Sequence, residues 1–223
     1  MPASSSIIIQ ITSISTALLA SGGIATLSLF DIPELQSQPA SRSLPLTRWL
    51  FSRGSHIFPS AAILSSTGFA LLAYNALPSS PNSSAVSTFV QHLTRGGPVS
   101  LYVAAAALSA SIGPITTLIM LPTNFKLIEM NERLGGARSE KSADTREGDV
   151  GGKARSAEES VDGKGDVSQW SDLSKPQSRT QRESSKEEDE EVKRLLSVFS
   201  FWNSVRAVAI GLGGVAGLTA ALA

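Results

Sequence analysis

Four long and nearly uncharged stretches most constrain how this chain of 223 residues can fold. They cover Ile7–Phe30, Ile57–Leu77, Val99–Leu121 and Leu195–Ala223. Each reaches the ~20 apolar residues that a helix needs to cross the hydrocarbon core of a bilayer. The sequence therefore predicts an all-α membrane protein, a bundle of four transmembrane helices with the lipid bilayer as its partner.

The charged residues are concentrated in one segment, Gly135–Val192. It holds 10 of the 19 basic and 15 of the 19 acidic residues, so its net charge is −5 and that of the remaining chain is +5. Because it has almost no apolar residues, it cannot bury enough surface to offset the entropy of ordering, which predicts a disordered loop. We expect residues 1–134 to carry three transmembrane helices, 135–192 to form this insert, and 193–223 to form the fourth helix. The insert is either a regulatory docking tail or an insertion that the fold tolerates.

The composition excludes several kinds of chemistry. The chain has no cysteine, so disulfides, thiolate catalysis and cysteine-bound metals are ruled out. With two histidines, a protein-built zinc site is not predicted. We expect no nucleic-acid partner. The first apolar stretch could be a cleaved signal peptide, but it lacks a basic start and continues to Phe30, which favours a retained helix.

The basic residues near the predicted helices indicate the orientation of the chain. The first loop, Asp31–Ser55, holds three arginines, and the third loop, Pro122–Arg194, holds many basic residues close to its ends. The second loop, Pro78–Pro98, holds one arginine. The positive-inside rule therefore places loops one and three in the cytosol. We expect the endoplasmic reticulum or another endomembrane as the location.

Polar residues gather near the helix ends that share the predicted cytosolic face. Asp31 closes the first helix, His56 opens the second, Asn124 follows the third, and Asn203 and Arg206 lie in the first turns of the fourth. Arg206 either faces inward in an ion pair, with Asp31 as partner, or extends to the lipid headgroups. His56 is either a base that titrates near neutral pH or a residue of the membrane interface.

Two further features concern the packing of the predicted helices. Gly213 and Gly217 form a small-xxx-small pair in the fourth helix, which favours close approach of a neighbouring helix. Pro114 interrupts the third helix and should kink it, because proline has no backbone N–H to donate.

The segment PITTLIMLPTNFKL resembles the signature of the anthrone oxygenase-like family of small four-span membrane proteins. Asn203, three residues before Arg206, matches a spacing that the family shows near its fourth helix. The opening SGGIATLSLFDIPEL and the segment RWLFSRGSHIFP also look like fungal members of the family. The positions of the signature that match are Pro114, Thr116, Met120, Thr123, Asn124 and Leu127.

The resemblance implies a possible activity and assigns roles to the polar residues. The best-known members oxidise an anthrone, an aromatic polyketide, to an anthraquinone with molecular oxygen and without metal or flavin. By this resemblance His56 would remove a proton, and Arg206, with Asn203 or Asn124, would hold the developing oxyanion. The alternative is a non-catalytic membrane scaffold or accessory protein.

Overall fold

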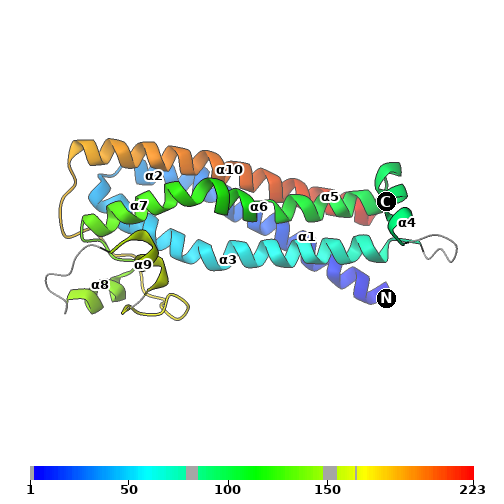
Figure 1. The fold of residues 1–223 in the computed structure, drawn as a ribbon, viewed down its shortest axis with the longest axis horizontal. Helices are drawn as coiled ribbons and strands as arrows, with labels where there is room; N and C mark the ends of the chain where they lie inside the picture. Colours follow the sequence, from blue (N-terminus) through cyan, green and yellow to red (C-terminus); the bar gives the residue numbers. More distant parts are fainter. Residues whose placement is uncertain (1–2, 79–84, 148–154, 164) are drawn as a thin grey trace. The chain divides into compact units, whose positions relative to one another are not determined.

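The computed structural model describes residues 3–78, 85–147, 155–163 and 165–223. About 80% of the protein is helical, and the described residues contain no strand. Figure 1 shows the helices in chain order. Their bounds are α1 (Ala3–Thr26), the π-helix η1 (Leu27–Asp31), α2 (Ile32–Gln36), α3 (Ala40–Asn75), α4 (Ala85–Arg95), α5 (Pro98–Ala110), α6 (Ile112–Pro114), the π-helix η2 (Ile115–Met120), α7 (Leu121–Arg133), α8 (Glu140–Glu147), α9 (Ala157–Asp162) and α10 (Lys186–Leu222).

The four predicted membrane-crossing helices are confirmed. Four continuous helical stretches are long and apolar enough to cross a membrane, namely Ser4–Gln36, Ala40–Asn75, Pro98–Arg133 and Lys186–Leu222. They extend well beyond the apolar stretches of the sequence. For example, α3 already begins at Ala40, within the predicted first loop. Apolar patterning marks only the part of a helix that contacts lipid, whereas backbone hydrogen bonding continues through its polar ends.

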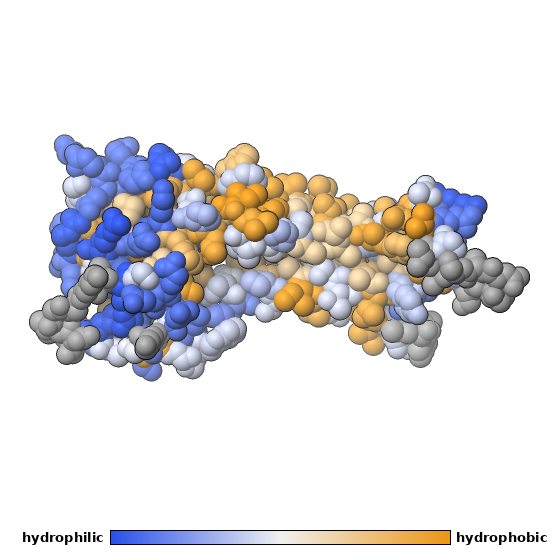
Figure 2. Space-filling model, in the orientation of Figure 1, coloured by the Kyte–Doolittle hydropathy of each residue, from blue (hydrophilic) through white to orange (hydrophobic). Residues whose placement is uncertain are grey.

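The chain divides into two compact units, and each is described here by itself. The first comprises residues 1–26, 58–116 and 203–223. Its core contains the buried side chains of Ile24, Phe69, Tyr102 and Ile210. Large apolar side chains such as Leu19 remain exposed, and Figure 2 shows hydrophobic surface along these helices, as expected for contact with lipid. Polar contacts also join these helices, and in one of them Gln10 Nε2 donates to the Tyr102 hydroxyl at 2.9 Å.

Glycines of α10 let neighbouring helices of the first unit approach closely. A methyl group added at Gly213 would lie 2.8 Å from Ser109 Oγ and 3.0 Å from the carbonyl oxygen of Ala105. One added at Gly217 would meet the ring of Phe69. The predicted small-residue pair thus packs against both α5 and α3. This is how helices associate in lipid, where van der Waals contact replaces the hydrophobic effect.

The interruption predicted at Pro114 takes the form of two helix types in succession. After α5 the chain turns at Ser111, forms the short α6, and continues as the π-helix η2. The Ile115 N–H still reaches the Ser111 carbonyl at 3.1 Å, and Thr116 Oγ1 donates to the Ile112 carbonyl at 2.6 Å. A wider π turn and a threonine hydroxyl are two ways in which a membrane helix compensates for the missing proline N–H.

The second unit comprises residues 27–57 and 117–202, and it includes the charged insert. Disorder is not confirmed for the described part of the insert, which forms α8, α9 and the start of α10; residues 148–154 and 164 lie outside the described residues. Helix α9 packs on α7. It begins with a capping box between Ser156 and Glu159 and ends at Gly163 in the left-handed conformation. Figure 2 shows hydrophilic surface over this part of the second unit.

The close approach at Gly217 leads to a test of packing in the first unit. Replacing Gly217 by leucine should lower the free energy of unfolding by about 1–3 kcal/mol, because the new side chain overlaps the Phe69 ring. Thermal unfolding in detergent measures this. Gly22→Leu is the matched control, because nothing lies within 4 Å of a methyl group added there. Equal unfolding temperatures for the two variants would contradict the described packing.

Candidate functional site

Asn203 and Arg206 form a buried polar pair in the first unit. The Asn203 side chain is fully buried, and its Nδ2 donates to the carbonyl oxygen of Ile24 at 2.9 Å. Its Oδ1 accepts from Arg206 Nη1 at 3.1 Å. Spacing of three residues places both side chains on one face of α10. The amide therefore holds the guanidinium group in a fixed orientation, and a cation is retained inside an apolar helix, where it is costly and often functional.

His56 lies near the middle of α3 and belongs to the second unit. Its ring stacks on Trp170 of the insert, with 3.9 Å between ring centroids and 35° between ring planes. The Trp170 side chain is otherwise largely exposed, at 75%. No local pattern predicts this partner for His56, because the two residues lie more than one hundred positions apart in the chain. One face of the imidazole is thus covered by the charged insert.

Asn124 lies near the start of α7, also in the second unit. Its Oδ1 is buried and makes no hydrogen bond with any residue that the structure describes. A buried carbonyl oxygen without a donor is uncommon, and such an atom can accept a hydrogen bond from a ligand or a water molecule. The role predicted for Asn124, donation to an oxyanion, uses the other end of its amide and stays a prediction.

The predicted site is thus divided between the two units. The structure brings Asn203 and Arg206 together in one, and places His56 and Asn124 in the other. Asp31 also belongs to the second unit, so its ion pair with Arg206 stays a prediction. So does the convergence of all four predicted catalytic residues.

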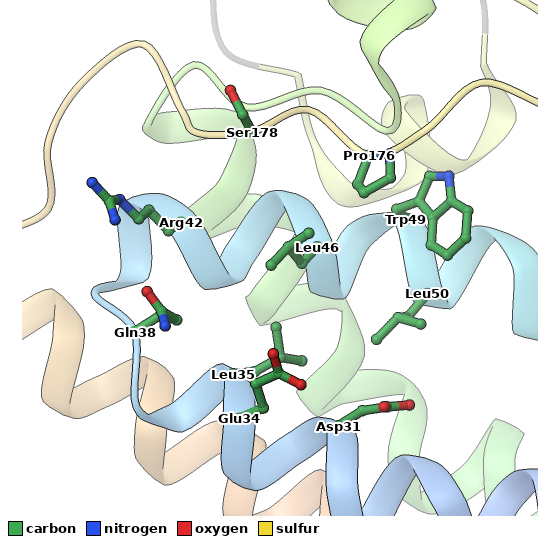
Figure 3. A pocket seen from close by; sticks show the side chains of 10 residues that line it. All are labelled: Asp31, Glu34, Leu35, Gln38, Arg42, Leu46, Trp49, Leu50, Pro176 and Ser178. Carbon is green, nitrogen blue, oxygen red and sulfur yellow. The ribbon is translucent and has the colours of Figure 1, made fainter.

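Asp31 lines a cleft of about 360 Å³ in the second unit. Figure 3 shows the cleft beside α2 and the first turns of α3. Pro176 and Ser178 of the insert also line it, and in this view they lie on the side of α3 away from α2. A second cleft of about 370 Å³ lies between α7 and the start of α10. Neither cleft is lined by the four predicted catalytic residues. The lining of the first comprises Asp31, Glu34, Leu35, Gln38, Arg42, Leu46, Trp49, Leu50, Pro176 and Ser178.

A buried network of charges organises the second unit, and the spacing of its members along the chain does not predict it. Arg146 donates to Glu132 Oε2 and to Asp166 Oδ2, each at 2.9 Å. Ser160 Oγ donates to Glu132 Oε1 at 2.6 Å, and Arg48 Nη2 donates to the Ser160 carbonyl at 2.9 Å. The network ties the insert to both α3 and α7. The capping boxes at Ser156–Glu159 and Ser185–Glu188 are local signals of order in the insert.

Among the described residues, no group of three or more potential ligands could hold a metal ion. The polar groups of the network are instead committed to one another. Burial tends to raise the pKa of Asp166, but the hydrogen bond from Ser142 and the charge of Arg146 outweigh it and lower this pKa below its ordinary value. The network contributes structure, and we assign it no chemistry.

Four helices long and apolar enough to cross a bilayer define the class, an all-α four-span membrane protein. A family model described as anthrone oxygenase matches residues 48–216, and the chain belongs to this family. The matched range includes all four predicted catalytic residues and the whole insert, but not Asp31. No curated protein and no solved structure matches the chain.

The lowered pKa of Asp166 leads to a prediction about the second unit. Replacing Asp166 by asparagine should destabilise this unit by ~3 kcal/mol, because Arg146 then lacks one of its two buried anions. In the wild type, the contribution of the Asp166 carboxylate to stability should be complete at neutral pH. It should be lost as the pH falls through the lowered pKa of Asp166, because the carboxylate must then accept a proton. Proteolysis rates of the insert at pH 7 measure the difference. Glu183→Gln, at an exposed ion pair, is the control; equal rates for both variants would contradict the network.

Proposed function

We propose that this protein is a membrane oxygenase that oxidises an anthrone-like polyketide with molecular oxygen. Membership of the anthrone oxygenase family supports this function. The single structural observation that carries it is the buried Arg206, which the Asn203 amide orients inside an apolar helix. A cation of this kind costs free energy, and stabilisation of an anion that forms during a reaction would justify it.

The proposed reaction converts an anthrone and O₂ into an anthraquinone and water. The substrate loses a proton from C10 to the His56 imidazole, and the resulting enolate places negative charge on its oxygen. Arg206, with Asn203 or Asn124, holds that oxyanion. Electrons pass from the enolate to O₂, a C10–O bond forms, and the peroxide anion takes back the proton from the His56 imidazolium to give a hydroperoxide. Loss of the second C10 hydrogen, with cleavage of the O–O bond, releases water and leaves the new carbonyl. The route draws its oxidant from O₂ and needs no cofactor from the protein.

A non-catalytic membrane scaffold is the second candidate. The hydrogen bond from Asn203 to the Ile24 carbonyl favours it, because the amide here joins α10 to α1 within the first unit. A structural clamp would need the same burial and the same bonds as a catalytic pair. The two candidates differ in whether replacement of Arg206 slows a reaction or only lowers stability.

The catalytic proposal is tested with membranes that carry the protein and a supplied anthrone, by following quinone formation above the spontaneous rate. His56→Ala should slow this reaction by about 10²-fold or more, because a positioned base contributes about this factor. Arg206→Met should cause a loss of similar size by removing oxyanion stabilisation. His92→Ala is the matched control, since this second histidine lies in α4 and is not among the predicted site residues.

Two outcomes would contradict the proposal in different ways. No excess rate with any of several anthrones would leave the scaffold as the better candidate. A full rate in the His56→Ala variant would retain the oxygenase and remove His56 from its mechanism. Thermal unfolding of each variant separates a lost reaction from a lost fold.

Sidedness is part of the proposal, with loops one and three in the cytosol of an endomembrane. The absence of cysteine allows a direct test by single-cysteine labelling. In sealed microsomes with the cytosolic face outward, a membrane-impermeant maleimide should label Leu173→Cys, at a side chain 86% exposed in the insert. It should label Thr94→Cys, in α4 of the second loop, only after permeabilisation. The reverse pattern would invert the proposed topology.

A further inference from the structure

We infer that the cleft beside Asp31 is a binding site for a flat aromatic ketone that carries hydroxyl groups. The inference deepens the proposed function by assigning its substrate class a holding site, separate from the predicted catalytic residues. Three properties of the cleft support the inference. They are its rigid apolar wall, its polar groups without partners in the second unit, and its position where the apolar surface of the helices ends.

The apolar wall of the cleft is held in place from behind. Trp49 Nε1 donates to the Ser174 carbonyl at 2.9 Å, and the Arg53 guanidinium lies 5.2 Å from the centre of the Trp49 rings. Figure 3 shows Trp49 beside Pro176 at one end of the cleft, with Leu46 and Leu50 on the adjoining turns of α3. Flat and pre-organised walls of this kind suit an aromatic ring system, because little side-chain freedom is lost on binding.

The polar groups of the cleft include both acceptors and donors that are not used within the unit. Among the side-chain bonds recorded within the described second unit, none involves the carboxylates of Asp31 and Glu34 or the Arg42 guanidinium, and Glu34 and Arg42 are exposed to solvent. Figure 3 places the two carboxylates on α2 and its preceding turn, and Arg42 with Gln38 toward the other end. Hydroxyl groups of a ligand can donate to the carboxylates, and its carbonyl oxygen can accept from Arg42 or Gln38.

This lining discriminates among amphipathic ligands. A phosphate could bond only to Arg42 and Gln38 at one end, and the two carboxylates in the same cleft would repel its charge, which disfavours an anionic lipid headgroup. A simple amine would satisfy the carboxylates but leave the donors at the other end of the cleft unused. A hydroxylated aromatic ketone matches both ends, and a cleft of about 360 Å³ lies within the usual size range of small-molecule sites.

The level of the cleft fits a ligand that partitions from the membrane. Leu29 and Phe30, directly before Asp31, are 65% and 67% exposed, as expected for side chains in lipid. On α10, the exposed side chain of Phe201 lies in the apolar part of the helix. Lys193 and Arg194, which form ion pairs, lie in its polar part. Asp31 thus lies where the apolar surface ends, in the layer where amphipathic aromatic molecules collect.

The test is equilibrium binding of 1,8-dihydroxyanthraquinone to the full-length protein in lipid nanodiscs. The quinone is already oxidised, so its binding is independent of turnover. The double variant Asp31→Asn/Glu34→Gln should weaken binding by about tenfold or more, since charge-assisted hydrogen bonds are lost. Leu46→Trp, which fills the cleft, should abolish binding. Glu129→Gln/Glu187→Gln, at the other cleft, is the matched control and should bind as the wild type does.

Two comparison ligands complete the experiment. Unsubstituted anthraquinone should bind at least about tenfold more weakly, and its equal affinity would overturn the assigned hydrogen bonds. Tighter binding of an aminoanthracene cation would replace the ketone by a cationic ligand class and overturn the inference. Wild-type affinity in the Leu46→Trp variant would place the ligand elsewhere. Because the probe is not turned over, binding at the cleft without anthrone oxidation refutes only the proposed function, and oxidation without binding refutes only the cleft.

Discussion

The fold of the second unit depends on the guanidinium group of Arg146, which lies between the buried carboxylates of Glu132 and Asp166. Asp166 also lies 3.6 Å from Arg155 and 3.9 Å from Arg138, but Arg146 alone bonds to both carboxylates, whose burial needs a cation to offset the cost of desolvation. Through Ser160 the same network reaches Arg48 of α3. The described part of a segment with few apolar residues is thus ordered by polar contacts between side chains.

In the first unit, the packing of apolar helices must be made specific. Its helices are apolar on the outside, so burial of apolar surface gives little preference for one arrangement over another. Specificity comes instead from close contacts at Gly213 and Gly217 and from a few polar bonds, such as the one from Asn203 to Ile24. Arg206 is held by one of these bonds. The residues that define the packing and those proposed for the chemistry therefore overlap.

The sequence predicts the parts of this fold that follow from composition and spacing. Long uncharged stretches define the four helices, and the spacing of Asn203 and Arg206 places them on one face. The order of the insert could not be predicted from its low apolar content, because its interior is made of ion pairs between residues far apart in the chain. The stack of His56 on Trp170 is equally non-local. The cleft beside Asp31 also needs the insert, which contributes Pro176 and Ser178.

The stack of His56 on Trp170 also gives the protein a built-in optical reporter. Protonated imidazole quenches the emission of an indole ring in contact with it, and the centroids here are 3.9 Å apart. The chain has three tryptophans, so replacing the other two would leave emission from this ring alone. Any change that separates the two rings could then be followed by light in an intact membrane, without a label and without knowledge of the substrate.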